Sequence, residues 1–387
     1  MESASMDSSS RGSIVAAMMI VLILGSSLVT CFPPVSNEPS FSVTGEVVGL
    51  SSYNQPKLDI KAEQILDEGI ELGSLFRIET ETATYEDAVL VESYLGVFMF
   101  DKFVNIESDG TISIGCVGKL IVEENGSQVT ITKTGESATY RYTPLYNASQ
   151  SDSRDDYPSD EVFANFYEVD GGTITSGVLY RSYSPLYDPE KQSRSIYVNQ
   201  LAEKAGIVFE AALSYSEANI AKIEKTLDGY CIDLIKDGDY IAPSMGYLYF
   251  QEKEKITSVL RSIIDHDGPY LIHCNAGRDR TGFAVLLIQS LCGCTEEEMR
   301  ENEVRAFQNL YLIETGSREY EVVSKSTYDR NMFLIAHPER IGDIFSIKWS
   351  DVDVSNVDTQ EAAYSFCTDY LGLSDDEVST LLSKLTS

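Results

Sequence analysis

The chain has 387 residues, and because domains commonly span roughly 100 to 200 residues, this length favours two domains over a single small module. Hydrophobic residues make up 43% and charged residues 23% of the sequence, close to globular averages, which excludes wholesale disorder, collagen and disulfide-rich miniature folds. The 29 Lys and Arg residues face 61 Asp and Glu residues, giving a formal net charge of -32. This acidity argues against nucleic acid and against an anionic membrane surface as partners, because both attract basic proteins.

The N-terminal residues have the features of an export signal. Residues 14–29 form an uncharged apolar run preceded by Arg11, short for a membrane span of about 20 residues but suited to the core of a signal peptide. Residues 28–31 (LVTC) are similar to a lipobox, in which the cysteine is lipidated, although Thr30 is unusual there. We therefore predict a lipoprotein export segment at residues 1–31, lipidated on Cys31. Ordinary secretion and a retained anchor helix are the alternatives, and all three place the body outside the cytoplasm.

Residues 41–148 are predicted to form a small all-β domain, a barrel or a sandwich. Six segments have the alternating, β-branched and aromatic composition of antiparallel strands. These segments are 41–50, 74–85, 88–100, 111–124, 128–135 and 138–145, with one helix near 60–66. The region holds no His, and its single Cys lies in an apolar strand-like stretch. We therefore expect a role in spacing or binding and no catalytic residues.

The C-terminal part is predicted to be an α/β domain. Residues 149–161 are rich in Ser and Asp and lack apolar periodicity, which predicts an exposed linker. Between residues 162 and 387, strand-like and helix-like segments alternate, which indicates a mainly parallel central sheet flanked by helices. Thr295 and Glu298 have capping-box spacing, and Ser374 begins a C-terminal helix.

The cysteines show no disulfide or metal-binding pattern. Apart from Cys31 there are six, without framework spacing, and the chain has only three His residues. We expect no metal and predict that most of the six are buried thiols. Cys274 differs from the others because of its neighbours.

Residues 271–282 read LIHCNAGRDRTG and connect a predicted strand to an apolar helix. A bare Cys-x5-Arg pattern occurs by chance in roughly a third of such chains, but the added His, Ala-Gly and Thr-Gly make coincidence negligible. Gly277 lets the loop curl so that backbone N–H groups point inward, and the helix that starts near Gly282 adds its positive end, together forming a phosphate cradle. The residues predicted to contact substrate in this cradle are Asn275, Ala276, Gly277, Arg278 and Gly282.

The same loop supplies the predicted reacting groups. Arg280 offers a planar fork that binds two phosphoryl oxygens and their transition-state charge. Its positive field lowers the pKa of the Cys274 thiol, which makes Cys274 the predicted nucleophile. Thr281 is placed to donate its hydroxyl to the departing sulfur. We expect His273 to orient the loop.

At these residues the chain resembles the Cys-based protein-tyrosine and dual-specificity phosphatases, and within them the bacterial tyrosine phosphatases whose loop reads HCxAGKDRTG, with Arg278 where Lys is usual. Asn165-Phe166, residues 179–185 and Met245 extend the resemblance. It implies hydrolysis in two steps through a phosphocysteine, without metal or other cofactor. The substrates implied are phosphotyrosine, phosphoserine or phosphothreonine, and in some members phosphoinositides. The expected partner is thus a phosphorylated protein or a small phosphomonoester, with membrane contact only through the N-terminal segment.

One position departs from the family pattern. Tyr215 stands where relatives have an Asp, and a general acid is worth about 10² to 10⁴ in rate. Asp279 is the best replacement, although a role in bracing the loop is equally open. Weaker candidates are Glu217, Asp237 and Asp239.

Two alternative functions therefore remain open. Tyr215 and the β domain suggest a phosphate-binding pseudophosphatase that acts as an envelope adaptor. An inositol-phosphate or phosphoinositide phosphatase ranks lower, because the acidic surface slows encounter with polyanions.

Overall fold

The computed structural model describes residues 41–51, 54–92, 97–98, 100–119, 121, 123–137, 150–188 and 193–387. Residues 39–387 group into one compact unit. The predicted export segment with Cys31 and the predicted strand at 138–145 lie outside the described residues. Within the described ranges, no helix has the length and apolar character needed to cross a membrane.

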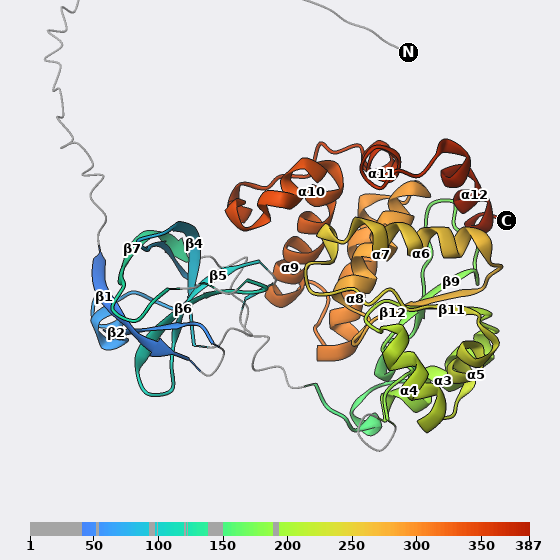
Figure 1. The fold of residues 1–387 in the computed structure, drawn as a ribbon, viewed down its shortest axis with the longest axis horizontal. Helices are drawn as coiled ribbons and strands as arrows, with labels where there is room; N and C mark the ends of the chain where they lie inside the picture. Colours follow the sequence, from blue (N-terminus) through green and yellow to red (C-terminus); the bar gives the residue numbers. More distant parts are fainter. Residues whose placement is uncertain are drawn as a thin grey trace, which may run out of the picture. The chain divides into compact units, whose positions relative to one another are not determined.

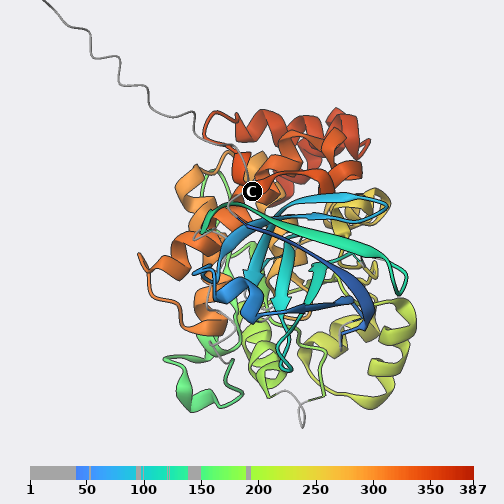
Figure 2. The same cartoon turned by 90° about the vertical axis from the view of Figure 1, so that its left-hand side faces the viewer.

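The N-terminal part is a closed β-barrel, which confirms the predicted all-β character (Figure 2). Its elements are β1 (Ser42–Leu50), β2 (Pro56–Lys61), α1 (Glu63–Leu66), β3 (Ser74–Glu79), β4 (Thr84–Val91), β5 (Lys102–Ile106), β6 (Thr111–Cys116) and β7 (Gln128–Ser137). The strand order is β1-β2-β6-β5-β4-β3-β7, and β1 pairs with β7. Only the β4–β5 pair is parallel within this barrel. Closure pairs the edges that an open sheet would expose.

Several predicted strand limits in the barrel are wrong, and the segment 111–124 ends as a strand at Cys116. The segment 74–85 is divided between β3 and β4, because the Thr80 hydroxyl accepts the N–H groups of Thr82 and Ala83 and closes a turn. The segment 88–100 ends as a strand at Val91, and Phe98 begins a turn that leads into β5.

The second sheet contains β8 (Tyr167–Glu168), β9 (Leu179–Ser182), β10 (Phe209–Ala212), β11 (Tyr240–Ile241) and β12 (Tyr270–His273). Its order is β11-β10-β12-β9-β8. The β11–β10, β10–β12 and β12–β9 pairs are parallel, and β8 runs antiparallel to β9. The last residue of β12, His273, pairs with Ala212 on one side and Ser182 on the other. The segment that follows His273 therefore starts between the carboxyl ends of two parallel neighbours, where α/β sheets commonly place their ligands.

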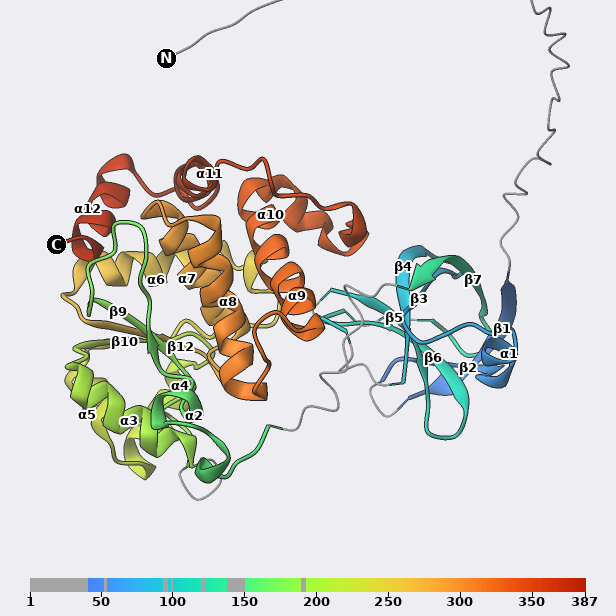
Figure 3. The same ribbon diagram turned by 180° about the vertical axis from the view of Figure 1, so that it is seen from behind.

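Helices cover both faces of this sheet. They are α2 (Asp160–Phe163), α3 (Arg194–Ala205), α4 (Glu217–Thr226), α5 (Tyr230–Asp237), α6 (Lys253–Asp265), α7 (Asp279–Leu291), α8 (Glu296–Tyr311), α9 (Arg318–Ser324), α10 (Arg330–Ala336), α11 (Thr359–Ser365) and α12 (Asp375–Leu385). In Figures 1 and 3, α3, α4 and α5 lie on one face, and α6 and α7 lie on the other. The alternation along β12 explains this arrangement, since Leu271 packs with the α3–α5 core, whereas Tyr270 and Ile272 join the α6–α7 core.

The predicted capping box at Thr295 and the predicted helix start at Ser374 are confirmed, and Ser374 also forms a capping box with Glu377. The predicted linker is mostly polar, but its Tyr157 is only 5% exposed. The Tyr157 hydroxyl donates to the Leu310 carbonyl at 3.2 Å. This part of the linker is therefore anchored on α8, which the Ser- and Asp-rich composition of the segment did not indicate.

Candidate active site

The loop after β12 is shaped by a close approach to β9. Gly277 has φ of +67°, and a Cβ atom there would lie 2.0 Å from the Ser182 carbonyl oxygen. Only glycine fits this position. The helix α7 begins at Asp279, earlier than the predicted start near Gly282, so its positive N-terminal end lies within the loop itself.

Neighbouring groups hold the loop carbonyls. Asn275 accepts the Ser184 N–H at 3.1 Å, and Ala276 accepts the Asn165 amide at 3.0 Å. The fully buried Arg181 donates to the carbonyls of Gly277 at 2.9 Å and Arg278 at 3.3 Å. The backbone N–H groups of residues 275–280 have no acceptor within the described part of the chain. The loop therefore offers a row of unused donors, which is the property of an anion-binding nest.

Cys274 lies at the start of this loop and is 2% exposed. Burial alone raises the pKa of its thiol, but the Arg280 charge and the Thr281 hydroxyl and N–H more than compensate, so that the pKa is lowered. The Thr281 hydroxyl has no other hydrogen-bond partner among the described residues. A thiol of lowered pKa next to a cation has the properties of a nucleophilic cysteine.

Arg280 is fixed beside the loop by α7 and the chain before α6. Its guanidinium donates to the Met245 carbonyl at 2.9 Å and lies 5.6 Å from the ring centre of the exposed Tyr247. Burial and the negative charge of Cys274 raise the pKa of Tyr187, which places this phenol within electrostatic reach of the thiol. Two aromatic side chains, Tyr187 and Tyr247, therefore lie near the residues of the cradle.

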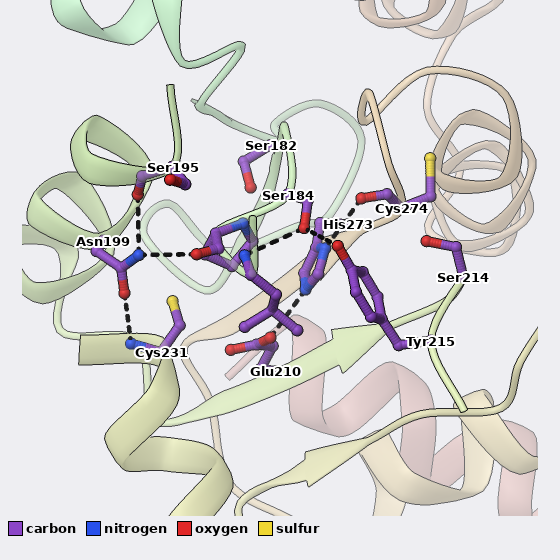
Figure 4. Close-up of polar contacts among 12 residues, drawn as sticks. Ser182, Ser184, Ser195, Asn199, Glu210, Ser214, Tyr215, Cys231, His273 and Cys274 are labelled. Carbon is purple, nitrogen blue, oxygen red and sulfur yellow. Dashed lines mark hydrogen bonds and ion pairs between the residues drawn. The ribbon is translucent and has the colours of Figure 1, made fainter. Parts of the chain in front are cut away.

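The His273 ring points toward Glu210 and away from the Cys274 sulfur (Figure 4). Its Nε2 is 2.8 Å from Glu210 Oε1, its Nδ1 is 3.1 Å from the Cys274 carbonyl oxygen, and both side chains are fully buried. Both ring nitrogens of His273 face oxygen atoms. The two hydrogen bonds, to Glu210 and to the Cys274 carbonyl, can therefore form together only when the His273–Glu210 pair carries two protons in total. This geometry fits the predicted orienting role. Glu210 was not among the predicted site residues, although an acid within the apolar strand FEAA is a signal for a buried polar contact.

The structure separates the acid candidates. Tyr215 is buried, and its hydroxyl lies 2.7 Å from Ser184 Oγ. Burial raises the pKa of Tyr215. Glu217 accepts the Tyr240 hydroxyl at 2.8 Å, and Asp237 is exposed at the end of α5. The Tyr215 hydroxyl and the Glu217 carboxylate are thus hydrogen-bonded to residues that are not part of the loop.

Asp279 is inside the loop and bound to its neighbour. Its carboxylate lies 3.0 Å from the Arg278 guanidinium, which also donates to the Tyr311 hydroxyl at 2.7 Å. The negative charge of Asp279 raises the pKa of the Cys274 thiol and so opposes the effect of Arg280, which means that the two groups are close enough to interact. Arg278 was predicted to contact substrate, but here its donors hold Asp279 and Tyr311.

Two other residues that were predicted to contact substrate, Asn275 and Gly282, lie near the two ends of the loop. Asn275 is exposed, and its side chain accepts the Ser214 hydroxyl at 2.6 Å. Gly282 contacts α8, where a Cβ atom would lie 2.6 Å from Glu303 Oε2.

The six cysteines that the structure describes are buried and unpaired, as predicted. No cluster of three or more His, Cys, Asp or Glu residues suited to a metal was found in the described ranges.

Glu303 is a buried acid that the sequence did not reveal. It is 3% exposed, and burial raises its pKa to about 7, with Asp279 adding to the shift and Arg181 opposing it. In the Glu-rich sequence of α8, nothing distinguishes Glu303 from the solvent-facing acids.

We predict that Glu303→Gln stabilises the protein at pH 8 and has little effect at pH 4.5. The folded-state pKa is above the unfolded value, so Glu303 keeps its proton in the fold. The associated stability is complete at low pH and is lost as pH rises through about 7. The lost stability corresponds to about 3 kcal/mol. Urea unfolding at the two pH values tests this, and equal effects at both would contradict it.

The comparisons with known proteins agree with this site. Residues 235–387 match the model of the tyrosine phosphatase family. This C-terminal part of the chain belongs to the Cys-based tyrosine phosphatase family and is a phosphatase hydrolase domain. The match includes Cys274, Arg280 and α7, whereas Asn165-Phe166 and residues 179–185 lie before it.

Other comparisons add little. No curated protein matches the chain. A solved structure, "Crystal structure of uncharacterized conserved protein from Thermotoga maritima", matches at 16% identity with a TM-score of 0.22. The match covers 23% of this chain and 35% of that one, so only about a third of that chain is spanned.

Proposed function

We propose that the protein hydrolyses phosphomonoesters as a protein-tyrosine or dual-specificity phosphatase, with phosphotyrosine in proteins as the main substrate. The observation that carries the proposal is the position of the buried Cys274 at the start of a loop whose N–H groups have no acceptor among the described residues, and Arg280 lowers the pKa of this thiol. Arg280 beside this loop supplies a fixed positive charge for the phosphoryl oxygens.

The proposed reaction has two steps. The Cys274 thiolate attacks phosphorus, forming the S–P bond as the P–O ester bond breaks, and Asp279 gives its proton to the departing oxygen. Water then attacks the phosphocysteine while Asp279 takes up a water proton. The S–P bond breaks, the Thr281 hydroxyl stabilises the departing thiolate, and inorganic phosphate is released.

Asp279→Asn tests the acid assignment. We expect turnover of phenyl phosphate to fall by about 10² or more, because phenolate is a poor leaving group without a proton. Turnover of para-nitrophenyl phosphate should fall much less, since nitrophenolate leaves readily. The measurement is kcat for both esters, with Glu217→Gln as the control. Equal losses for the two esters would assign Asp279 to bracing alone.

The aromatic residues beside the cradle support an aryl phosphate as substrate. Tyr187 and Tyr247 offer ring surfaces for packing against a phosphotyrosine side chain. The net charge of -32 opposes encounter with inositol polyphosphates. We expect hydrolysis of a phosphotyrosine peptide in chelator-containing buffer, at least about tenfold faster than of a phosphoserine peptide or inositol hexakisphosphate. Faster release from the inositol phosphate would overturn the substrate assignment.

A phosphate-binding pseudophosphatase is the second candidate. The buried Tyr215, hydrogen-bonded to Ser184 at the position expected for an acid, favours it. Tight binding of the phosphotyrosine peptide with no release of phosphate would select this function over the first.

We also propose that the protein acts outside the cytoplasm, attached through a lipid on Cys31 or secreted. The support is the apolar run at residues 14–29 and the residues before Cys31. Mass spectrometry of the mature N-terminus tests it, and an intact, unmodified residue 1 on protein from the native membrane fraction would exclude a lipoprotein.

A further inference from the structure

The turn between β4 and β5 of the barrel contacts residues that support the active-site loop. The Phe98 ring lies 6.3 Å from the ring of Phe307 in α8. The Arg278 guanidinium lies 4.9 Å from the centre of the same Phe307 ring. Arg278 in turn binds Asp279. A chain of direct contacts therefore runs from the barrel to the proposed general acid.

Asp101 fixes this turn on both sides. Its Oδ2 accepts the Phe98 N–H at 3.0 Å, and its Oδ1 accepts the Arg330 guanidinium of α10 at 2.6 Å. The Asp101 and Arg330 side chains are 0% and 6% exposed. A buried ion pair holds its partners firmly, because separating them leaves a charge without compensation. The turn that carries Phe98 is thereby attached to the helices of the phosphatase domain.

Phe100 strengthens the attachment. It is 2% exposed and adopts φ of +71°, a left-handed conformation that is rare for a bulky residue and requires support from its surroundings. Its ring lies 5.5 Å from Phe250, which is 4.8 Å from Phe283 in α7. Through Phe98 the turn contacts α8, which lies behind Arg278. Through Phe100 and Phe250 it is linked to α7, the helix that carries Arg280.

The space between these groups is small. Phe98, Phe307, Arg278, Asp279 and Glu303 all line one cavity of about 30 Å³. Such a volume holds roughly one or two waters and no substrate. Loss of the Phe98 ring would enlarge this cavity next to the Arg278–Asp279 pair.

We propose that Phe98 is a positioning residue for catalysis, holding Arg278 through Phe307 so that the protonated carboxyl group of Asp279 stays where it gives its proton to the leaving oxygen. This inference rests on the proposed function. It gives the barrel a part in the reaction, because its β4–β5 turn completes the support of the catalytic loop. The contacts of Phe98 lead through Phe307 to Arg278 and Asp279, so the step that depends on Asp279 is the one affected.

The test compares two esters in the full-length chain. For Phe98→Ala we expect kcat with phenyl phosphate to fall about tenfold, kcat with para-nitrophenyl phosphate to change by less than about twofold, and KM to stay constant. Phe98→Leu, which keeps most of the apolar contact, should recover most of the phenyl phosphate activity. Phe41→Ala is the matched control, since Phe41 is also half-buried but packs on Phe76 within the barrel.

General destabilisation by Phe98→Ala would lower kcat with both esters equally, and this result would overturn the inference. An equal loss of phenyl phosphate activity in Phe41→Ala, or no loss in Phe98→Ala, would overturn it as well. If Phe98→Ala does not fold, Phe98→Val removes less of the contact and is judged by the same ratio of esters. The proposed function fails separately, if the wild-type chain releases no phosphate from either ester.

Discussion

Replacing Cys274 by Ser is expected to abolish turnover of every phosphomonoester, lowering kcat by a factor on the order of 10⁴ to 10⁶. The thiol has a lowered pKa because Arg280 and Thr281 favour its charged form despite burial. A serine hydroxyl in the same place has a far higher pKa, and no base contacts it, since the buried His273 faces Glu210 and the Cys274 carbonyl. The variant should still bind phosphotyrosine peptide, because the loop N–H groups and Arg280 remain.

The matched control is Cys294→Ser. This cysteine is also buried, and its sulfur faces the Asp170 carbonyl at 4.0 Å, a contact that a hydroxyl can keep. Release of inorganic phosphate from a phosphotyrosine peptide measures turnover. Rapid acid quenching of the wild-type reaction, followed by peptide mapping, should find phosphate on the peptide that contains Cys274. Full activity in Cys274→Ser, or phosphate on another residue, would exclude the phosphocysteine mechanism.

The active-site loop could be predicted from the sequence because its residues are consecutive. Cys274, Gly277 and Arg280 lie within seven positions of one another, and the strand and helix on either side have clear apolar patterns. A strand that leads into a helix gives such a segment one geometry, so local sequence determines the cradle. The strong N-caps at Thr295 and Ser374 were predictable for the same reason.

The support of the loop could not be predicted, because its parts are far apart in the chain. Glu210 meets His273 across neighbouring strands, and Asp101 meets Arg330 over 229 positions. No local periodicity encodes which buried acid meets which base. The apolar residues at 88–100 suggested one long strand, whereas part of that run packs as a turn against the phosphatase helices.

Arg280→Ala is expected to lower kcat by about 10³. A fixed guanidinium that stabilises the transition-state charge on the phosphoryl oxygens accelerates such reactions by this factor or more. The same change should raise the pKa of the Cys274 thiol. Burial raises this pKa, and Arg280 is the largest of the influences that lower it, so its removal leaves the effect of burial dominant.

The thiol pKa can be measured without turnover, from the rate of iodoacetamide alkylation against pH. The thiolate is the reactive form, so wild-type alkylation should rise at a pH below the ordinary thiol value of 9.0, and alkylation of Arg280→Ala at a higher pH. Arg280→Lys separates the two roles of the side chain, because it keeps the charge but loses the fork. We expect Lys to restore much of the thiol acidity and little of the turnover. Arg261→Ala, which removes a surface arginine paired with Glu377, is the control. If the alkylation profile of Arg280→Ala matches that of wild type, Arg280 does not activate the thiol, and the charge that lowers its pKa must come from the loop N–H groups and the start of α7.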